Sequence, residues 1–224
     1  MKVILETDRL FLREYVEEDA EAFFKLNSDP EVLRFVPDKR LLNVEQARQI
    51  LVDHPIADYR KYGFGRGACI LKSTGEQIGF AGLKYLEEFG EVDVAFRLMR
   101  THWGLGLATE AALGSVRFGF ADLGLKRIIG LVMPENIASV RVLEKTGLRY
   151  AETVMFWGSQ FAKYVITPQS QDSCLPRRRL AKEGSFVRQP AGFVVVPLNR
   201  RQQREQSFIC PNLSLGRGFL GFLL

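Results

Sequence analysis

The feature that most constrains the fold of this 224-residue chain is a strand that runs into a helix through two glycines. Residues 91–96 alternate polar and apolar side chains before becoming wholly apolar, which is typical of a strand with one wet face. Gly104-Leu105-Gly106 follows, and apolar residues then recur at every fourth position from Ala108 to Phe120. That spacing predicts an amphipathic helix, so the junction indicates a domain that mixes strands and helices.

The rest of residues 1–169 also alternates short strand and helix patterns. Capping residues delimit one helix, because Asn136 can serve as its N-cap and Gly147 stands where a left-handed C-cap residue belongs. The glycine of Gly158-Ser159 is expected to form the turn of the last hairpin, between the strands at 153–156 and 161–166. We expect strands at 10–12, 68–71, 78–81, 91–96, 127–133, 153–156 and 161–166, and helices at 17–27, 44–62, 108–120 and 136–146.

The composition changes after Thr167-Pro168, so we predict one domain over 1–168 and a separate extension over 169–224. Residues 170–224 hold nine Lys/Arg and three Asp/Glu, and they account for the net charge of +5. No helix or strand period is sustained there, which predicts an irregular, disordered tail. A basic arm that contacts RNA or the ribosome is the alternative. It is less favoured, because no regularly placed aromatics accompany the basic residues to stack bases.

Composition excludes several other classes of protein. The chain is 46% apolar and 25% charged, as is ordinary for a globular protein, and no apolar run is long enough to span a bilayer. Charged residues at Glu6, Asp8 and Arg9 interrupt the stretch that an export signal would keep apolar. Three cysteines without paired spacing and two histidines indicate no metal site. We therefore expect a cytoplasmic protein without membrane or metal partners.

The glycine loop suits a phosphate ligand. A tight turn before a helix directs several backbone N–H groups to one spot, and the positive end of the helix reinforces them. By itself this pattern is equally consistent with a plain turn, because it lacks the third glycine of dinucleotide-binding loops and the Lys-Ser/Thr of nucleoside-triphosphate loops.

Two further motifs accompany the loop. The chain carries Glu6-Thr7-Asp8-Arg9-Leu10-Phe11-Leu12-Arg13 near its start, the loop itself within Arg100 to Ala111, and an Asn-initiated helix from Asn136 to Leu148. Taken in this order, the three stretches resemble the GNAT superfamily of acetyl-CoA-dependent N-acetyltransferases. The resemblance is closest to the subgroup that includes the ribosomal-protein alanine N-acetyltransferases, and it covers roughly residues 5–167.

The resemblance implies an α+β fold, the GNAT fold. Its mostly antiparallel mixed sheet is splayed between strands 4 and 5, with helices on both faces and acetyl-CoA in the splay. The backbone of Leu98 and Met99 would pair with the pantetheine arm. Asn136 and Ser139 would lie beside that arm, although Asn136 is as readily an N-cap and Ser139 as readily a first-turn helix residue. The loop would hold the pyrophosphate through Trp103, Gly104, Leu105, Gly106, Leu107, Ala108 and Thr109, mainly by backbone amides.

The chemistry of an N-acetyltransferase requires a base, because an amine is largely protonated at neutral pH. By position, Asp93 is the best-placed candidate and Glu91, two residues away on the same strand face, is the fallback; both are also consistent with a wet sheet edge. Leu143 stands where many family members have a proton-donating tyrosine, and Tyr164 is a weaker substitute that is also consistent with a core residue.

These residues predict an enzyme that moves an acetyl group from acetyl-CoA to a primary amine by direct attack on the thioester. The acceptor is expected to be a protein N-terminus or a small molecule. The alternative is a catalytically silent GNAT-fold module that only binds acyl-CoA, which the missing tyrosine would favour.

Overall fold

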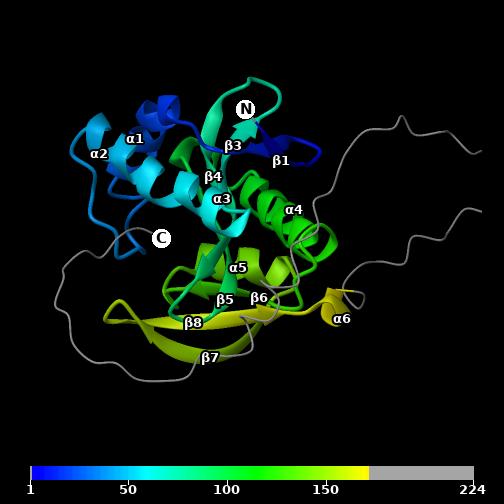
Figure 1. The fold of residues 1–224 in the computed structure, drawn as a ribbon. Coiled ribbons are helices and arrows are strands. Elements are labelled where there is room, and N and C mark those ends of the chain that lie inside the picture. Colours follow the sequence, from blue (N-terminus) through cyan, green and yellow to red (C-terminus); the bar gives the residue numbers. More distant parts are fainter. Residues whose placement is uncertain (1, 172–224) are drawn as a thin grey trace, which may run out of the picture. The chain divides into compact units, whose positions relative to one another are not determined.

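The computed structural model describes residues 2–171, which form an eight-stranded sheet with helices packed against it (Figure 1). The predictions for residues 172–224 lie outside this range. The order of strands across the sheet is β1-β2-β3-β4-β5-β6-β8-β7. Their bounds are β1 Val3–Glu6, β2 Leu10–Arg13, β3 Arg66–Leu71, β4 Gln77–Leu86, β5 Glu91–Leu98, β6 Ile128–Val132, β7 Arg149–Phe156 and β8 Ser159–Ile166.

The sheet opens between β5 and β6. These strands form its only parallel pair among the described residues, and they are matched at a single position, Asp93 opposite Ile129. Every other neighbouring pair is antiparallel and matched over three or more residues. Strands β5 and β6 are the fourth and fifth strands expected from the sequence, so the splayed, mostly antiparallel α+β fold is confirmed.

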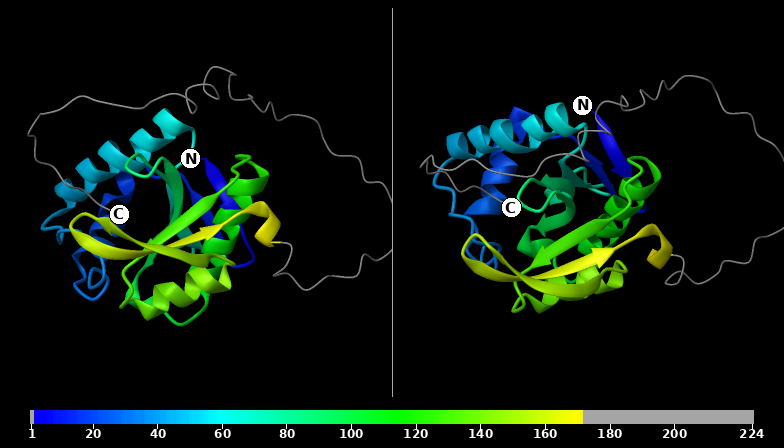
Figure 2. Two further views of the ribbon diagram at one scale, coloured as in Figure 1. Left: turned by 90° about the horizontal axis from the view of Figure 1, so that it is seen from below. Right: turned by 60° about the horizontal axis from the view of Figure 1, so that its bottom comes forward.

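Helices cover both faces of the sheet, as the views in Figures 1 and 2 show. Helices α1 (Ala20–Ser28) and α2 (Val44–Leu51) pack against one face of the sheet, at Ala68, Ile70 and Phe80. Helix α4 (Leu107–Ala121) packs against the opposite face of the sheet, at Cys69 and Ala81. None of the helices within residues 2–171 is long and apolar enough to cross a bilayer. The α-helices are α1 Ala20–Ser28, α2 Val44–Leu51, α3 Ala57–Tyr62, α4 Leu107–Ala121, α5 Ile137–Lys145 and α6 Pro168–Gln171, with short helical turns η1 Glu17–Asp19, η2 Val52–Ile56 and η3 Arg100–His102.

One strand was missed, and two expectations are confirmed with added detail. Strand β1 was not predicted, although it pairs with β2 at the edge of the sheet. The helical region expected over 44–62 is present with these bounds, and within it η2 is a π-helical segment that contains Pro55; proline has no N–H to donate to the preceding turn. The glycine of Gly158-Ser159 forms the last hairpin turn together with Trp157, both with positive φ, and Ser159 begins β8.

Candidate active site

The glycine loop, residues 103–106, connects η3 to α4 and is exposed. Gly104 and Gly106 have φ of 74° and 77°, a left-handed conformation that glycine adopts without steric cost. The first α4 amide with a backbone acceptor is that of Glu110, which donates to the Gly106 carbonyl at 3.1 Å. The amides of Leu107, Ala108 and Thr109 precede it and have no such acceptor among the described residues, as expected for a helix start. Amides arranged in this way, together with the helix dipole, can bind an anion, and we call them the anion cradle.

Trp103 folds back over the strand that precedes the loop. Its indole Nε1 donates to the Leu98 carbonyl at 2.7 Å, while 49% of the residue stays exposed. The indole N–H is therefore used within the protein. Any polar contact between this loop and a phosphate must come from the backbone, as the sequence predicted for a loop with tryptophan at this position.

The backbone around Met99 is already paired. The Met99 amide donates to the Ile78 carbonyl at 2.8 Å, and its carbonyl accepts from the His102 amide at 2.9 Å. The sequence had nominated both Leu98 and Met99 for the pantetheine arm. The Met99 amide is therefore used within the protein, whereas the carbonyls of Leu98 and Met99 each keep a second lone pair beside the one that Trp103 or His102 uses, so both carbonyls stay candidates for the pantetheine arm.

Asp93 lies in the splay itself. Its carboxylate reaches across from β5, and Oδ1 accepts the backbone N–H of Leu131 on β6 at 3.0 Å. Oδ2 makes no hydrogen bond among the residues that the structure describes. Asp93 is only 3% exposed, and this burial raises its pKa from 3.8 to about 6, against the opposing effects of the Leu131 N–H, Arg66 and Lys84. An aspartate of this kind is ionised at neutral pH and is a stronger base than an exposed one.

Glu91, the fallback, has a different environment. One of its carboxylate oxygens contacts Arg127 at 2.7 Å, and the other contacts Lys163 at 2.5 Å. Both oxygens of Glu91 therefore contact cations, whereas Asp93 forms no ion pair within residues 2–171.

Tyr164 lies on β8 in the hydrophobic core. It pairs with Gly130 of β6, and its ring contacts Tyr150 edge to face at 5.9 Å. Burial raises its pKa, so the phenol keeps its proton at neutral pH. Within residues 2–171, no hydrogen bond joins Tyr164 to Asp93.

Asn136 and Ser139 form the predicted cap of α5. The Asn136 side chain accepts the Ser139 amide at 3.1 Å, and Gly147 beyond the end of the helix has a φ of 97°. The predicted capping of this helix is confirmed. Ser139 is half-buried and lies in the first turn.

Sequence reasoning missed a cluster of charged groups around Asp93, which we call the charged cluster: His54, Asp58, Arg66, Lys84 and Asp93. Lys84 stands directly opposite Asp93 on β4, so the two side chains share a face of the sheet. Burial lowers the pKa of Lys84 to about 8, lowers that of His54 and raises that of Asp58. Arg66 is 6% exposed and packs over the Phe80 ring.

The charged cluster adjoins a small pocket between the helices and the sheet. The pocket is lined by Tyr15, Phe23, Ile50, His54, Pro55, Arg66 and Phe80. Perturbed pKa values gathered beside a pocket are typical of functional sites. The only sign of the charged cluster in the sequence was that Arg66 and Lys84 are charged residues within strands. No group of three or more His, Cys, Asp or Glu residues within 2–171 is arranged to hold a metal ion.

Comparison with known proteins identifies the family. Residues 9–149 match the Acetyltransferase (GNAT) domain. The chain belongs to the GNAT acetyltransferase family. It is 37% identical to the uncharacterized N-acetyltransferase p20 of Bacillus licheniformis over 141 residues, which are 62% of this chain and 78% of that protein.

Solved structures of GNAT proteins share the fold of this acetyltransferase. Mycobacterium smegmatis RimJ in complex with CoA-disulfide has a TM-score of 0.65 at 19% identity, covering 75% of this chain and 91% of that one. AAC(6')-Ib in complex with ribostamycin and coenzyme A has a TM-score of 0.63 at 18% identity, covering 77% and 98%. The predicted GNAT acetyltransferase fold is thereby confirmed.

Proposed function

We propose that this acetyltransferase moves the acetyl group of acetyl-CoA to a primary amine by direct attack of the amine on the thioester. One observation carries the proposal: strand β5 bears the buried Asp93 at the splay and leads at its carboxyl end into the glycine loop. This arrangement supports a base and an anion cradle on one continuous segment. Relatives of the same fold hold CoA, which supports the identity of the donor.

The donor would be held mainly by backbone. The amides from Gly104 to Thr109 fit a pyrophosphate, because the loop is exposed and its first helical amides have no backbone acceptor. The backbone carbonyls of Leu98 and Met99 are the proposed partners of the pantetheine arm. Asn136 and Ser139 would lie beside that arm, with the Asn136 amide nitrogen and the Ser139 hydroxyl as the groups that capping leaves available.

Asp93 is the proposed general base. Its Oδ2 would take one proton from the ammonium form of the acceptor, directly or through one water, so that the neutral amine can attack. The thioester supplies the acetyl group: the amide bond forms, the C–S bond breaks, and the sulfur leaves as a thiolate that takes up one proton. The Tyr164 phenol is the proposed donor of that proton, and it regains a proton from the second N–H that the attacking nitrogen gives up as it becomes an amide. Glu91 stays the fallback for the base.

The acceptor is proposed to be a protein N-terminus or a small-molecule amine. The AAC(6')-Ib structure holds the aminoglycoside ribostamycin, which supports the small-molecule alternative. A panel of amines assayed by CoA release from the full chain separates the two alternatives. CoA release that rises with none of the amines would contradict direct attack and favour a silent binding module.

Gly106→Val tests the loop, and Gly124→Val is its matched control. Both glycines have positive φ, at 77° and 65°. A Cβ at Gly106 would meet only Arg9, at 3.6 Å, and a Cβ at Gly124 would meet nothing within 4 Å. Each variant therefore carries a similar backbone strain of about 1–3 kcal/mol, but only position 106 borders the proposed cradle. We expect the acetyl-CoA KM to rise at least about tenfold in Gly106→Val alone. Equal KM values in the two folded variants would refute the site.

A further inference from the structure

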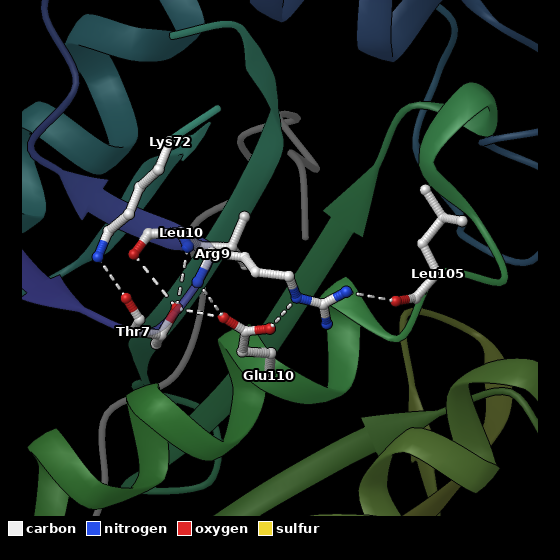
Figure 3. Close-up of polar contacts among 6 residues, drawn as sticks. All are labelled: Thr7, Arg9, Leu10, Lys72, Leu105 and Glu110. Atoms are coloured by element: carbon white, nitrogen blue, oxygen red, sulfur yellow. Dashed lines mark hydrogen bonds and ion pairs between the residues drawn. The ribbon is translucent and has the colours of Figure 1, made fainter. Parts of the chain in front are cut away.

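Arg9 joins the turn between β1 and β2 to the first turn of α4, 101 residues later in the chain (Figure 3). Its backbone N–H donates to Glu110 Oε1 at 2.8 Å, and its side-chain Nε donates to Glu110 Oε2 at 2.6 Å. The Thr7 hydroxyl also donates to Oε1, at 2.7 Å. Three donors from one turn thus hold a single carboxylate.

The same guanidinium also contacts the glycine loop. Arg9 Nη1 donates to the Leu105 carbonyl at 2.9 Å, as Figure 3 shows. In a trans peptide the C=O and the following N–H point in opposite directions, and the described chain contains no cis peptide. By holding the Leu105 carbonyl, Arg9 therefore fixes the Gly106 N–H so that it points away from the guanidinium. Gly106 could otherwise rotate this peptide at little cost, since glycine is the least restricted residue.

The negative charge of Glu110 lies close to the glycine loop, and the Arg9 guanidinium neutralises it. A carboxylate in the first turn of α4 would repel an anion bound at the same helix end. Burial alone would raise the pKa of Glu110, but the bonds from the Arg9 amide, the Thr7 hydroxyl and the Arg9 side chain outweigh it and lower the pKa. Glu110 therefore stays ionised, and the Arg9 guanidinium cancels its charge next to the loop.

We propose that Arg9 is a positioning residue for the donor substrate, and this rests on the proposed function of the glycine loop. Arg9 acts through two neighbours. It orients the Leu105–Gly106 peptide so that the Gly106 amide faces the pyrophosphate, and it neutralises Glu110. Its effect is confined to donors that carry a pyrophosphate.

The test compares two acetyl donors on the full chain: acetyl-CoA, and S-acetylpantetheine, which has the thioester arm but no pyrophosphate. In Arg9→Ala we expect the acetyl-CoA KM to rise about tenfold or more, as fits the loss of a charge-assisted hydrogen bond, with kcat within about twofold. The kcat/KM for S-acetylpantetheine should change by less than about twofold. A merely structural role would impair both donors equally.

Two companion variants complete the design. Lys72→Ala is the control, because the Lys72 ammonium donates to the Thr7 carbonyl in the same turn, as Figure 3 shows. Lys72 also contacts Glu6 at 2.6 Å, and no hydrogen bond or ion pair joins it to the glycine loop within residues 2–171. Lys72→Ala should leave the acetyl-CoA KM unchanged. Arg9→Lys keeps the charge but lacks the planar set of donors that reaches Glu110 and Leu105 together, so its KM should lie between those of wild type and Arg9→Ala.

The possible failures are distinguishable. Equal losses with both donors, or an unchanged acetyl-CoA KM in folded Arg9→Ala, would overturn the role of Arg9. If Arg9→Ala does not fold, Arg9→Lys decides the question by the same comparison of donors. A wild-type protein that shows no preference for acetyl-CoA over S-acetylpantetheine would instead refute the proposed function of the loop.

Discussion

Replacing Asp93 by asparagine should make the protein more stable and less active. Asparagine keeps an oxygen that can accept the Leu131 N–H, but it carries no charge into a site that is only 3% exposed. The pKa of Asp93 is raised from 3.8 to about 6, and one pKa unit is worth about 1.4 kcal/mol. Burying the charged form thus costs the wild type on the order of 3 kcal/mol of unfolding free energy at neutral pH.

The stability difference between wild type and Asp93→Asn should depend on pH. Between about pH 4 and 6 the folded protein retains a proton on Asp93 that the unfolded chain has released, so wild-type stability falls as pH rises through this window. Below pH 4 both states are protonated, and Asp93→Asn should match the wild type. Above pH 6 the variant should melt about 6–12 °C higher, at roughly 2–4 °C per kcal/mol. Thermal melts of both proteins from pH 3.5 to 8 measure the difference.

Asp93→Ala is the matched control. It also removes the charge but leaves the Leu131 N–H without its acceptor, so it should be about 1–3 kcal/mol less stable than Asp93→Asn. The kcat of Asp93→Asn should fall most near neutral pH and recover at high pH, where the amine deprotonates unaided, and wild-type kcat/KM should decline below about pH 6. A melting difference that is constant across pH would refute the reasoning about the buried charge. A loss of activity that is uniform across pH would show that Asp93 has a structural role and is not the base.

Further predictions concern single side chains. In Glu91→Gln, the fall of kcat/KM on the acid side of the pH profile should stay near pH 6, because that fall is assigned to Asp93. A shift of this fall to another pH would make Glu91 the base. Tyr164→Phe keeps the ring contact with Tyr150 and should lower kcat at least about tenfold at unchanged melting temperature if the phenol donates the proton; a smaller effect would leave Tyr164 a core residue. Asn136→Ala should cost about 1 kcal/mol in thermal melts through the lost helix cap, and a larger acetyl-CoA KM would show contact with the donor as well.

Much of the fold follows from patterns that act over a few residues. Helix α5 begins at an N-cap and ends before a left-handed glycine as predicted, and the glycine loop opens α4 as its residue types require. Strands β2 to β8 each overlap a predicted strand, although β4 and β7 are about twice as long as the predicted 78–81 and 153–156. Short strands at an edge, such as β1, carry too little pattern to be found in this way. The π-helical segment η2 within the 44–62 helical region contains Pro55, and its geometry depends on how the backbone around this proline packs.

The environment of the site was decided by tertiary structure. Asp93 could be nominated from the sequence, but its burial and its bond to Leu131 arise from a neighbouring strand 38 positions away in the chain. The cross-strand register places Lys84 beside it, and the packing of helices over that face buries His54 and Asp58. The Arg9–Glu110 contact likewise joins two segments whose local patterns are independent of each other. Local sequence sets backbone preferences within a turn or strand, whereas a side chain's pKa and partners depend on which distant segments the folded sheet brings within a few ångströms of it.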